Sequence, residues 1–242
     1  MRPPEAWYAA RAMQALEVLA FQPLSAPQLA AALQVHPRTA RRLLNRLRDE
    51  GWLTRSDDTR RLYAPTMRIV ALAGQIVQRA QIAERAVPVV AALHGDTGAV
   101  AHLAIPSYRS VLCLVHGNGA GPAEPGLHEL APAHCTATGK ALLGHRQAWR
   151  DSVLAGPLEP RTARTITDAG VLLAETETAR ARGYATEDGE YRPGVRGVAA
   201  PVFAPSGEAV AALGVSGEGN LDLEAVAAHV LAAARSLGEA HG

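Results

Sequence analysis

Apolar residues recur at helical spacing in three successive segments at the start of the chain. Residues 6–21 carry an apolar stripe that predicts a first helix. Ser25 and Gln28 have the spacing of a capping box, in which the serine hydroxyl caps an early N–H, so a short second helix should begin there. Pro37 suits the first turn of a third helix that runs to about Glu50. Two short helices joined by a tight turn are typical of a helix-turn-helix unit.

The third predicted helix separates apolar and basic side chains onto different faces. Ala40, Leu43 and Leu47 repeat along the face that should be buried. An α-helix fits the major groove of DNA, and an arginine can bond two acceptors on guanine. This helix is therefore predicted to read DNA. The residues that it would use are Arg38, Thr39, Arg41, Arg42 and Asn45.

A hairpin is predicted directly after this helix. Residues 52–55 and 61–63 have the composition of strands, and 56–60 form a polar turn between them. Beside a recognition helix, such a hairpin is a wing. Its arginines, Arg55, Arg60 and Arg61, are expected to reach phosphates or the minor groove. The alternative is a solvated arginine face on an ordinary helical bundle.

The distribution of charge supports two parts with different partners. The 242 residues have a net charge of only +1, too weak for a global field that attracts nucleic acid. Residues 1–74, however, hold 11 arginines and 6 acidic residues, a balance of +5. The rest holds 13 basic and 17 acidic residues, a balance of −4. This asymmetry favours nucleic acid as the partner of the first part.

A linker helix is predicted over residues 67–86, where Ile69 and Leu72 begin another apolar stripe. It would join a winged helix-turn-helix domain at 1–66 to a second domain at 87–242. Paired recognition helices read symmetric half-sites, so the linker is a candidate self-association surface, and a homodimer or a dimer of dimers is expected. The alternative is that the linker packs only on its own chain.

The second domain mixes strand-like and helix-like segments. Their order predicts an antiparallel sheet flanked by helices, and hence an α+β fold for the chain. Strands are expected near 99–105, 111–115, 184–188, 195–203 and 209–216, and helices near 83–94, 138–143, 168–182 and 222–238.

The composition bears on the cellular compartment in which the protein is expected. No apolar run is long enough to span a membrane, and the N-terminus lacks the apolar core of a signal peptide. Cys113 and Cys135 are the two cysteines, too few for a disulfide framework. We therefore expect a cytoplasmic protein without a membrane partner.

Motifs for catalysis or metal binding are incomplete. The segment 138–141 lacks parts of a P-loop, and 214–218 is one residue short of a nucleophile elbow. No enzyme activity, catalytic residue, cofactor or metal is therefore expected. Two alternatives stay open: an enzyme with a basic accessory domain, and a regulator that senses metal or redox state. The latter would use Cys113, Cys135 and some of His94, His102, His116, His128 and His134.

Three stretches of the second domain resemble the effector domain of IclR-family transcriptional regulators. They are PAHCTATGKALL at 132–143, RGYATEDGE at 182–190 and GVRGVAAPVF at 194–203, and the strand at 211–217 also fits. The first part resembles the winged helix-turn-helix of the same family. The resemblance implies a GAF-like effector-binding domain, double-stranded operator DNA and a small-molecule effector as partners, and repression as the default role.

The resemblance also implies which residues bind the effector. By motif position they are Ala137, Thr138, Glu187, Val195, Gly197, Gly214 and Ser216. Thr136 or Thr138 would cap a helix whose first N–H groups suit the small organic acids that this family often binds. Gly197 and Gly214 stand where the family often has larger or hydroxyl side chains. A larger, less polar pocket and a bulkier or partly aromatic acid are therefore expected.

Each of these residues also has a purely structural interpretation. Thr138 would then be only a helix cap, Ser216 would bond only to backbone, and Glu187 would be a solvated turn residue. Lys140, the only lysine, is expected to be exposed or salt-bridged rather than to contact the ligand.

Overall fold

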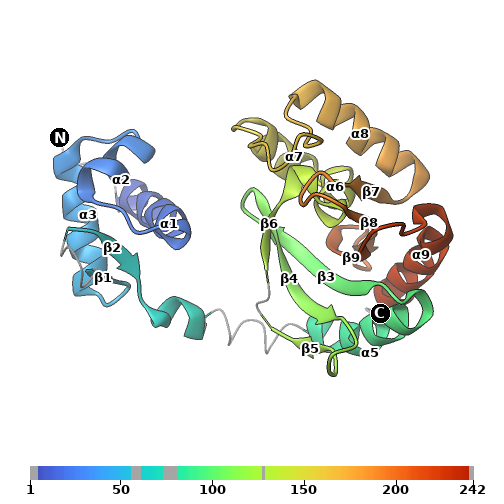
Figure 1. The fold of residues 1–242 in the computed structure, drawn as a ribbon. Coiled ribbons are helices and arrows are strands. Elements are labelled where there is room, and N and C mark those ends of the chain that lie inside the picture. Colours follow the sequence, from blue (N-terminus) through green and yellow to red (C-terminus); the bar gives the residue numbers. More distant parts are fainter. Residues whose placement is uncertain (1–4, 56–60, 73–80, 127–128, 240–242) are drawn as a thin grey trace. The chain divides into compact units, whose positions relative to one another are not determined.

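A computed structural model describes residues 5–55, 61–72, 81–126 and 129–239. The chain divides into two compact units, Met1–Ile76 and Val77–Gly242 (Figure 1). The wing turn, which includes Arg60, lies outside the described residues, and so does the middle of the predicted linker. Each unit is treated by itself below.

The N-terminal unit is a winged helix-turn-helix, as predicted. Its elements are α1 (Glu5–Phe21), α2 (Ala26–Ala32), α3 (Pro37–Asp49), β1 (Leu53–Arg55) and β2 (Tyr63–Pro65). Leu19, Leu29, Leu44 and Leu53 are at most 2% exposed, and one hydrophobic cluster contains them all. These leucines come from α1, α2, α3 and β1, so the helices and the wing share a single small core.

Local signals fix where the second and third helices begin. Gln28 Oε1 accepts from the backbone N of Ser25 at 2.9 Å, as a capping box requires. The Ser25 side chain faces the backbone N of Gln28 as in the predicted capping box, and its hydroxyl also donates to the same Gln28 oxygen at 2.6 Å. His36 comes directly before Pro37 and caps the start of α3. Its Nδ1 accepts from the backbone N of Arg38 at 3.2 Å. Proline then begins the helix without losing a backbone hydrogen bond.

The second wing strand begins two residues later than predicted. Tyr63, 4% exposed, is the residue that this strand buries in the core. Its backbone also exchanges hydrogen bonds with Leu24 at 2.9 and 3.2 Å. Pairing with the α1–α2 connection therefore sets the start of β2, and the hairpin sequence alone does not contain this constraint.

The predicted linker is described only at its ends. Residues 67–72 are helical, and α5 spans Gln81–Thr97. Ala83 and Ala86, which the sequence assigned to the linker, are fully buried in the core of the C-terminal unit. This end of the segment packs on its own chain, while the predicted domain boundaries at 66/67 and 86/87 stay a prediction.

Within the described residues, seven strands form one antiparallel sheet in the C-terminal unit, as predicted. They are β3 (Val100–Ser107), β4 (Ser110–Gly117), β5 (Glu124–Pro125), β6 (Leu130–Pro132), β7 (Ala185–Asp188), β8 (Val195–Phe203) and β9 (Ala209–Glu218). Their order is β5-β4-β3-β9-β8-β7, and β6 also pairs with β4. The chain thus has the predicted α+β fold.

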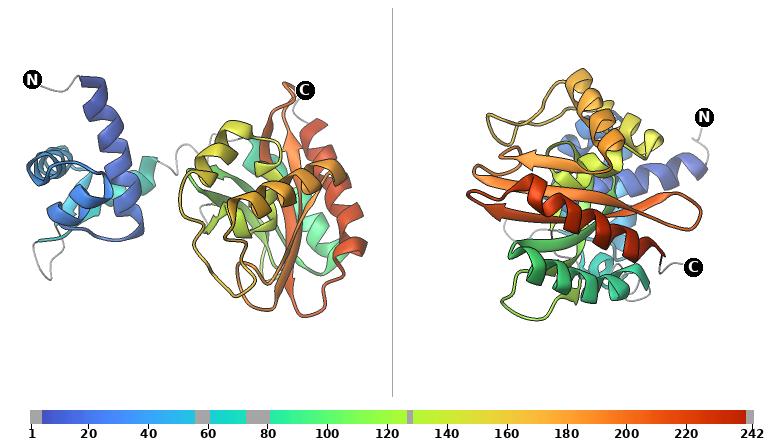
Figure 2. Two further views of the ribbon diagram at one scale, coloured as in Figure 1. Left: turned by 90° about the horizontal axis from the view of Figure 1, so that it is seen from above. Right: turned by 90° about the vertical axis from the view of Figure 1, so that its right-hand side faces the viewer.

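Helices cover both faces of this sheet (Figure 2). One face packs against α5 and α9 (Leu223–Glu239) through a cluster that includes Leu103, Leu213 and Val230. The other face carries α6 (Ala137–Leu143), on which α8 (Ala169–Arg182) packs. Beneath α6 the sheet presents small side chains, Ala104, Ala199 and Ala212, so the helix can approach closely.

Short elements account for most of the differences from the sequence prediction. The segments β5, β6 and α7 (Gln147–Leu154) were not predicted, and neither was a 3-10 turn at Ala133–Cys135. Two- and three-residue strands are too short to display a period. Among the described residues, no helix has both the length and the apolar character needed to cross a membrane.

Candidate nucleic-acid interface and ligand cavity

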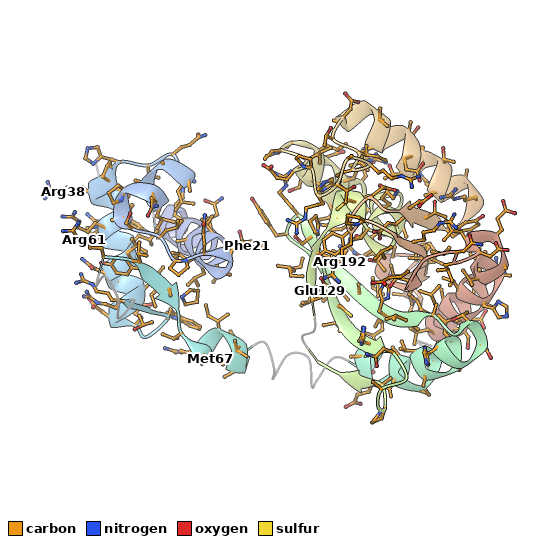
Figure 3. The ribbon with its side chains drawn as sticks, viewed as in Figure 1. Phe21, Arg38, Arg61, Met67, Glu129 and Arg192 are labelled. Carbon is orange, nitrogen blue, oxygen red and sulfur yellow. The ribbon has the colours of Figure 1, made fainter. Side chains whose placement is uncertain are left out.

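The first turns of α3 present unengaged basic side chains. Arg38 and Arg41 are exposed, and within the described part of the chain neither guanidinium makes a hydrogen bond or ion pair. Arg38 and Arg61 project outward on the same side of this unit (Figure 3). Farther along α3, Arg46 pairs with Glu50 at 3.0 Å and Arg48 with Asp49 at 2.6 Å. The free positive charge is therefore at the N-terminal end, the part of a recognition helix that contacts bases.

Other predicted DNA contacts are partly used within the protein. The Tyr63 hydroxyl donates to Asn45 Oδ1 at 2.9 Å and accepts from an Arg55 guanidinium N–H at 3.2 Å. The Arg55 guanidinium also lies 5.4 Å from the centre of the Tyr63 ring. These contacts tie α3 to both wing strands, so Asn45 and Arg55 position the wing.

Arg42 and Thr39 are also less free than the sequence suggested. The Arg42 guanidinium donates to the Tyr8 hydroxyl and lies 5.3 Å from the centre of that ring, which connects α3 to α1. Thr39 is half-buried. Among the described residues of the predicted interface, Arg38, Arg41 and Arg61 thus remain exposed and without a protein partner.

A cavity of about 760 Å³ lies on the sheet face that carries α6. Six of the seven residues predicted to bind effector line it: Ala137, Thr138, Glu187, Val195, Gly197 and Ser216. The volume falls within the range usual for small-molecule sites. The motif positions thus converge on one hollow although they are far apart in the sequence.

Gly214, the seventh residue, is not among the residues that line the cavity. A Cβ atom there would lie 2.8 Å from both the Ala199 Cβ and the Val198 carbonyl oxygen. Close packing of β9 against β8 therefore explains this glycine. Gly197 is also confined, because a Cβ would lie 2.9 Å from the Val215 carbonyl oxygen. Neither glycine simply enlarges the cavity, so this part of the prediction was wrong.

Glu187 is a buried acid in β7, so the alternative interpretation as a solvated turn residue was wrong. It is 5% exposed, and its Oε1 accepts from the backbone N of Tyr191 at 3.1 Å. Burial raises the pKa of Glu187 to about 7, because the charged carboxylate loses its hydration. Near neutral pH this side chain can therefore accept a hydrogen bond or donate one.

The start of α6 is capped by Thr136. Its hydroxyl oxygen accepts from the backbone N of Gly139 at 3.2 Å, while the hydroxyl donates to the Pro132 carbonyl at 3.0 Å. Thr138, 3% exposed, is therefore not the cap. The Ser216 hydroxyl makes no hydrogen bond to any described residue, so the interpretation of Ser216 as bonded only to backbone was wrong.

Lys140 is salt-bridged, one of the two predicted outcomes, although it is almost fully buried. Its Nζ lies 2.6 Å from Glu190 Oε1 and 3.6 Å from Glu175 Oε1. The side chain is 1% exposed. The lysine thus joins α6 to α8 and to the loop after β7, behind the cavity wall.

Several lining residues were not predicted as effector contacts, and half of them are polar. They include His102, Cys113, His116, Glu129, Tyr191, Arg192 and Glu218. The cavity wall therefore combines polar and apolar side chains. A sequence signal existed for His102, because alternate residues of a strand share a face, and Val100, His102 and Ala104 all line the cavity from β3. Tyr191 and Arg192 lie in the gap between two recognised motifs and carry no such signal.

The metal and redox alternative finds little support in this geometry. Burial raises the pKa of the Cys113 and Cys135 thiols to about 12, so both remain thiols near neutral pH. His102 and His116 are cross-strand partners on β3 and β4. Across the described ranges, no group of three or more His, Cys, Asp or Glu side chains is placed to hold a metal ion. His128 lies outside those ranges.

Models of known protein families match the sequences of both units. The family model described as bacterial transcriptional regulator IclR C-terminal matches residues 74–239. The chain belongs to the IclR family of transcriptional regulators. A model of the MarR family matches residues 9–62, which span the winged helix-turn-helix.

Relatives of this IclR-family protein extend over almost its whole length. The HTH-type transcriptional regulator BhcR of Paracoccus denitrificans is 31% identical over 238 residues, which cover 94% of this chain and 84% of that protein. The probable transcriptional regulator SauR of Cupriavidus necator is 31% identical, covering 86% and 84%. An IclR regulator structure from a Silicibacter species has a TM-score of 0.77, 25% identity, and coverage of 97% and 96%.

These relatives are regulators of transcription. The protein is accordingly a DNA-binding transcriptional regulator, and the hypothesis of an enzyme with a basic accessory domain is abandoned.

Proposed function

We propose that this regulator is a repressor that binds double-stranded operator DNA and responds to an organic acid, preferably an aromatic one, held in the cavity of its C-terminal unit. The cavity of about 760 Å³, with six of the seven motif residues in its wall, is the observation that carries the proposal. A hollow of this size accommodates an aromatic ring with substituents.

Similar proteins support this ligand class. An IclR homologue from Microbacterium hydrocarbonoxydans, 22% identical with a TM-score of 0.65, was crystallised with 4-hydroxybenzoate. Such a likeness establishes only a shared fold, so we use 4-hydroxybenzoate as a first probe. A phenolic hydroxyl would find an acceptor in Glu187, which is buried in the cavity wall.

DNA binding would use Arg38, Arg41 and the wing of two copies of the chain. One recognition helix covers only a half-site, so a homodimer or a dimer of dimers is part of the proposal. Exposed apolar side chains on the N-terminal unit support it: Phe21 is 63% exposed, Met13 64% and Met67 74%. Phe21 and Met67 are labelled in Figure 3. Apolar surface of this kind is typical of interaction sites.

The ligand would act by linkage between the two sites. An acid that binds one arrangement of the oligomer more tightly shifts the population toward it. If that arrangement spaces the recognition helices differently from the half-sites, operator affinity falls.

Two measurements test this proposal. The first selects an operator from a random duplex library and compares R38A and R41A with R46A. Each of the first two should lower operator affinity about tenfold or more, the size of a lost base contact. R46A should have a small effect, because Glu50 already neutralises Arg46. Equal effects of all three substitutions would contradict the assignment of the interface.

The second measurement screens aromatic and aliphatic acids by thermal shift, followed by operator titration with each acid that stabilises the protein. A stabilising acid that weakens operator binding is the expected result. If no acid in the screen changes both the melting temperature and operator affinity, the proposed effector class is wrong.

A further inference from the structure

A charged cluster at the open side of the cavity has no place in the proposal so far. Glu129, directly before β6, accepts on its Oε1 from the Tyr191 hydroxyl at 2.8 Å and from the Arg192 guanidinium. Tyr191 and Arg192 belong to the loop between β7 and β8. All three side chains line the cavity. Glu129 and Arg192 lie next to one another in Figure 3.

This cluster connects opposite walls of the cavity. The strand order places β4, with its partner β6, and β7 toward opposite ends of the sheet. Glu129 is fixed to the first wall, because its carbonyl accepts from the backbone N of Cys113 at 2.8 Å. The contacts of Tyr191 and Arg192 with Glu129 thus link these two walls across the cavity. The Glu129 carboxylate is the group that holds the two walls together.

The β7–β8 loop is built to present these donors. The Thr162 hydroxyl donates to the Gly189 carbonyl at 2.6 Å, and the Thr165 hydroxyl donates to the Glu190 carbonyl at 2.7 Å. The backbone N of Tyr191 is bonded to Glu187. A donor pair held in this way loses little conformational entropy when it captures a ligand.

Two arginines lie beside the tyrosine of this cluster, although the cavity as a whole is lined by three acidic side chains, Glu129, Glu187 and Glu218, and by one arginine, Arg192. The Arg192 and Arg161 guanidiniums lie 5.1 and 5.6 Å from the centre of the Tyr191 ring. The Arg161 guanidinium has no carboxylate partner among the described residues. Two guanidiniums therefore flank one tyrosine, and Glu129 is the carboxylate bonded there. A ligand carboxylate that accepted from Arg192 would make a charge-assisted hydrogen bond, which is stronger than the bond of a neutral group of the same shape.

We propose that Arg192 and Tyr191 form the carboxylate receptor of the cavity, and that Glu129 occupies this receptor until the carboxylate of a ligand replaces it. The inference rests on the proposed function, since it assigns the acidic end of a ligand to a place in that cavity. The exchange conserves hydrogen bonds: the ligand accepts from the two donors, and Glu129, whose side chain is already 44% exposed, turns to water. Because a ligand must compete with Glu129 for these two donors, only a group that binds them as well as a carboxylate does can replace it.

The test compares an acid with its amide. Full-length protein is titrated with 4-hydroxybenzoate and 4-hydroxybenzamide by calorimetry. E129Q should bind the acid about fivefold more tightly than the wild type. The substitution removes the exposed ion pair of Glu129 with Arg192, which is of modest strength, and it removes a negative charge that repels the carboxylate of the acid. Affinity for the amide should stay within about twofold, since it brings no charge. R192Q should abolish the preference for the acid.

Matched controls isolate the cluster from general charge effects. E218Q removes another carboxylate that lines the cavity but does not pair with Arg192, so its acid-to-amide ratio should rise less than that of E129Q. R164Q removes an arginine that pairs with Asp188 at 3.1 Å, and it should keep the ratio of the wild type. A readout without ligand is amide hydrogen exchange at 190–192, which should be faster in E129Q than in E218Q.

The results separate this inference from the proposed function. If E129Q binds 4-hydroxybenzoate no more tightly than the wild type, including the case in which neither binds it, the receptor assignment is overturned. It is also overturned if R192Q still prefers the acid. The proposed function fails separately, when no acid changes operator binding by the wild type.

Discussion

Glu187 shows how one buried side chain can couple ligand binding to pH. Its carboxyl lies in the cavity wall, where the backbone N–H groups of Tyr191 and Ala137 act on it. Burial and the neighbouring Glu190 raise its pKa, while these two hydrogen bonds and Lys140 oppose the rise. The folded protein therefore favours the protonated acid over a wider range of pH than the unfolded chain does.

The raised pKa predicts a specific dependence of stability on pH. Because the pKa rises from 4.5 to about 7 on folding, this stabilisation is complete below pH 4.5 and is lost as pH increases through about 7. The loss is about 3 kcal/mol at most. In urea unfolding, E187Q should lack this decline and gain stability over the wild type as pH rises from 5 to 8. Parallel curves for the two proteins would show that Glu187 ionises normally.

Lys140 is a residue whose role could not be predicted from its sequence motif. The motif placed it at a helix start, but burial beside Glu190 depends on α8 and the β7–β8 loop. Loss of the partner of this ammonium group would destabilise the fold, because the remaining buried charge would have no water around it.

Breaking this buried pair should be costly. K140M leaves the Glu190 carboxylate without its cation and should lower the free energy of unfolding by about 3–5 kcal/mol. The double variant K140M/E190Q removes both charges and should recover part of that loss. Chemical denaturation of both variants measures the difference. A double variant less stable than K140M would contradict the explanation by an uncompensated charge.

At the scale of elements, α6 depends on a helical glycine. Gly139 faces the 3-10 turn at Ala133–Cys135, and a Cβ atom there would collide with the Ala133 carbonyl oxygen. The helix can therefore lie against the turn that precedes it. Because α6 supplies Ala137 and Thr138 to the cavity, this contact also positions the ligand site.

Gly139 and Gly95 make a matched pair of helical glycines. G139A should lower the free energy of unfolding by roughly 3 kcal/mol or more, because backbone atoms must shift to relieve the collision. G95A in α5 adds a Cβ atom that meets nothing within 4 Å. It should stabilise the protein by about 0.5 kcal/mol through helix propensity. Thermal denaturation that finds similar effects at both sites would refute the packing argument.

Elements with a strong period could be predicted from the sequence, and short or loop-borne features could not. The helices α1 to α3 and the long strands β3, β8 and β9 repeat apolar residues over several turns or pleats. By contrast, β6 has three residues, and Tyr191 and Arg192 lie between strands. Their place in the cavity wall follows from how the β7–β8 loop reaches Glu129, which no local pattern encodes.

For the whole molecule, the near-neutral net charge hides two opposite requirements. The balance of +5 over residues 1–74 suits a unit that meets phosphates, and the −4 over the remainder reduces nonspecific attraction of the rest of the chain to DNA. Charge could be assigned to parts of the chain from the sequence. The cavity needed the fold, because its wall combines residues from 100 to 218.

Linkage gives a test at the scale of the whole molecule. Any acid that weakens operator binding by a given factor must be bound more weakly, by the same factor, when operator is present. The two factors can be measured by anisotropy of labelled operator and by calorimetry of the acid with and without operator. R38A should remove the effect of DNA on the acid while leaving the affinity for the acid in the absence of DNA unchanged. Unequal factors would mean that the acid acts at a second site.

The Tyr63 hydroxyl, which bridges Asn45 on α3 and Arg55 on β1, bears on any attempt to redesign operator preference. A graft of foreign recognition-helix residues that replaced Asn45 would also remove the acceptor that orients the tyrosine, and with it the arginine of the wing. Helix and wing must therefore be exchanged as one cassette, Pro37 through Pro65, and natural divergence of target sequence should have changed these positions together.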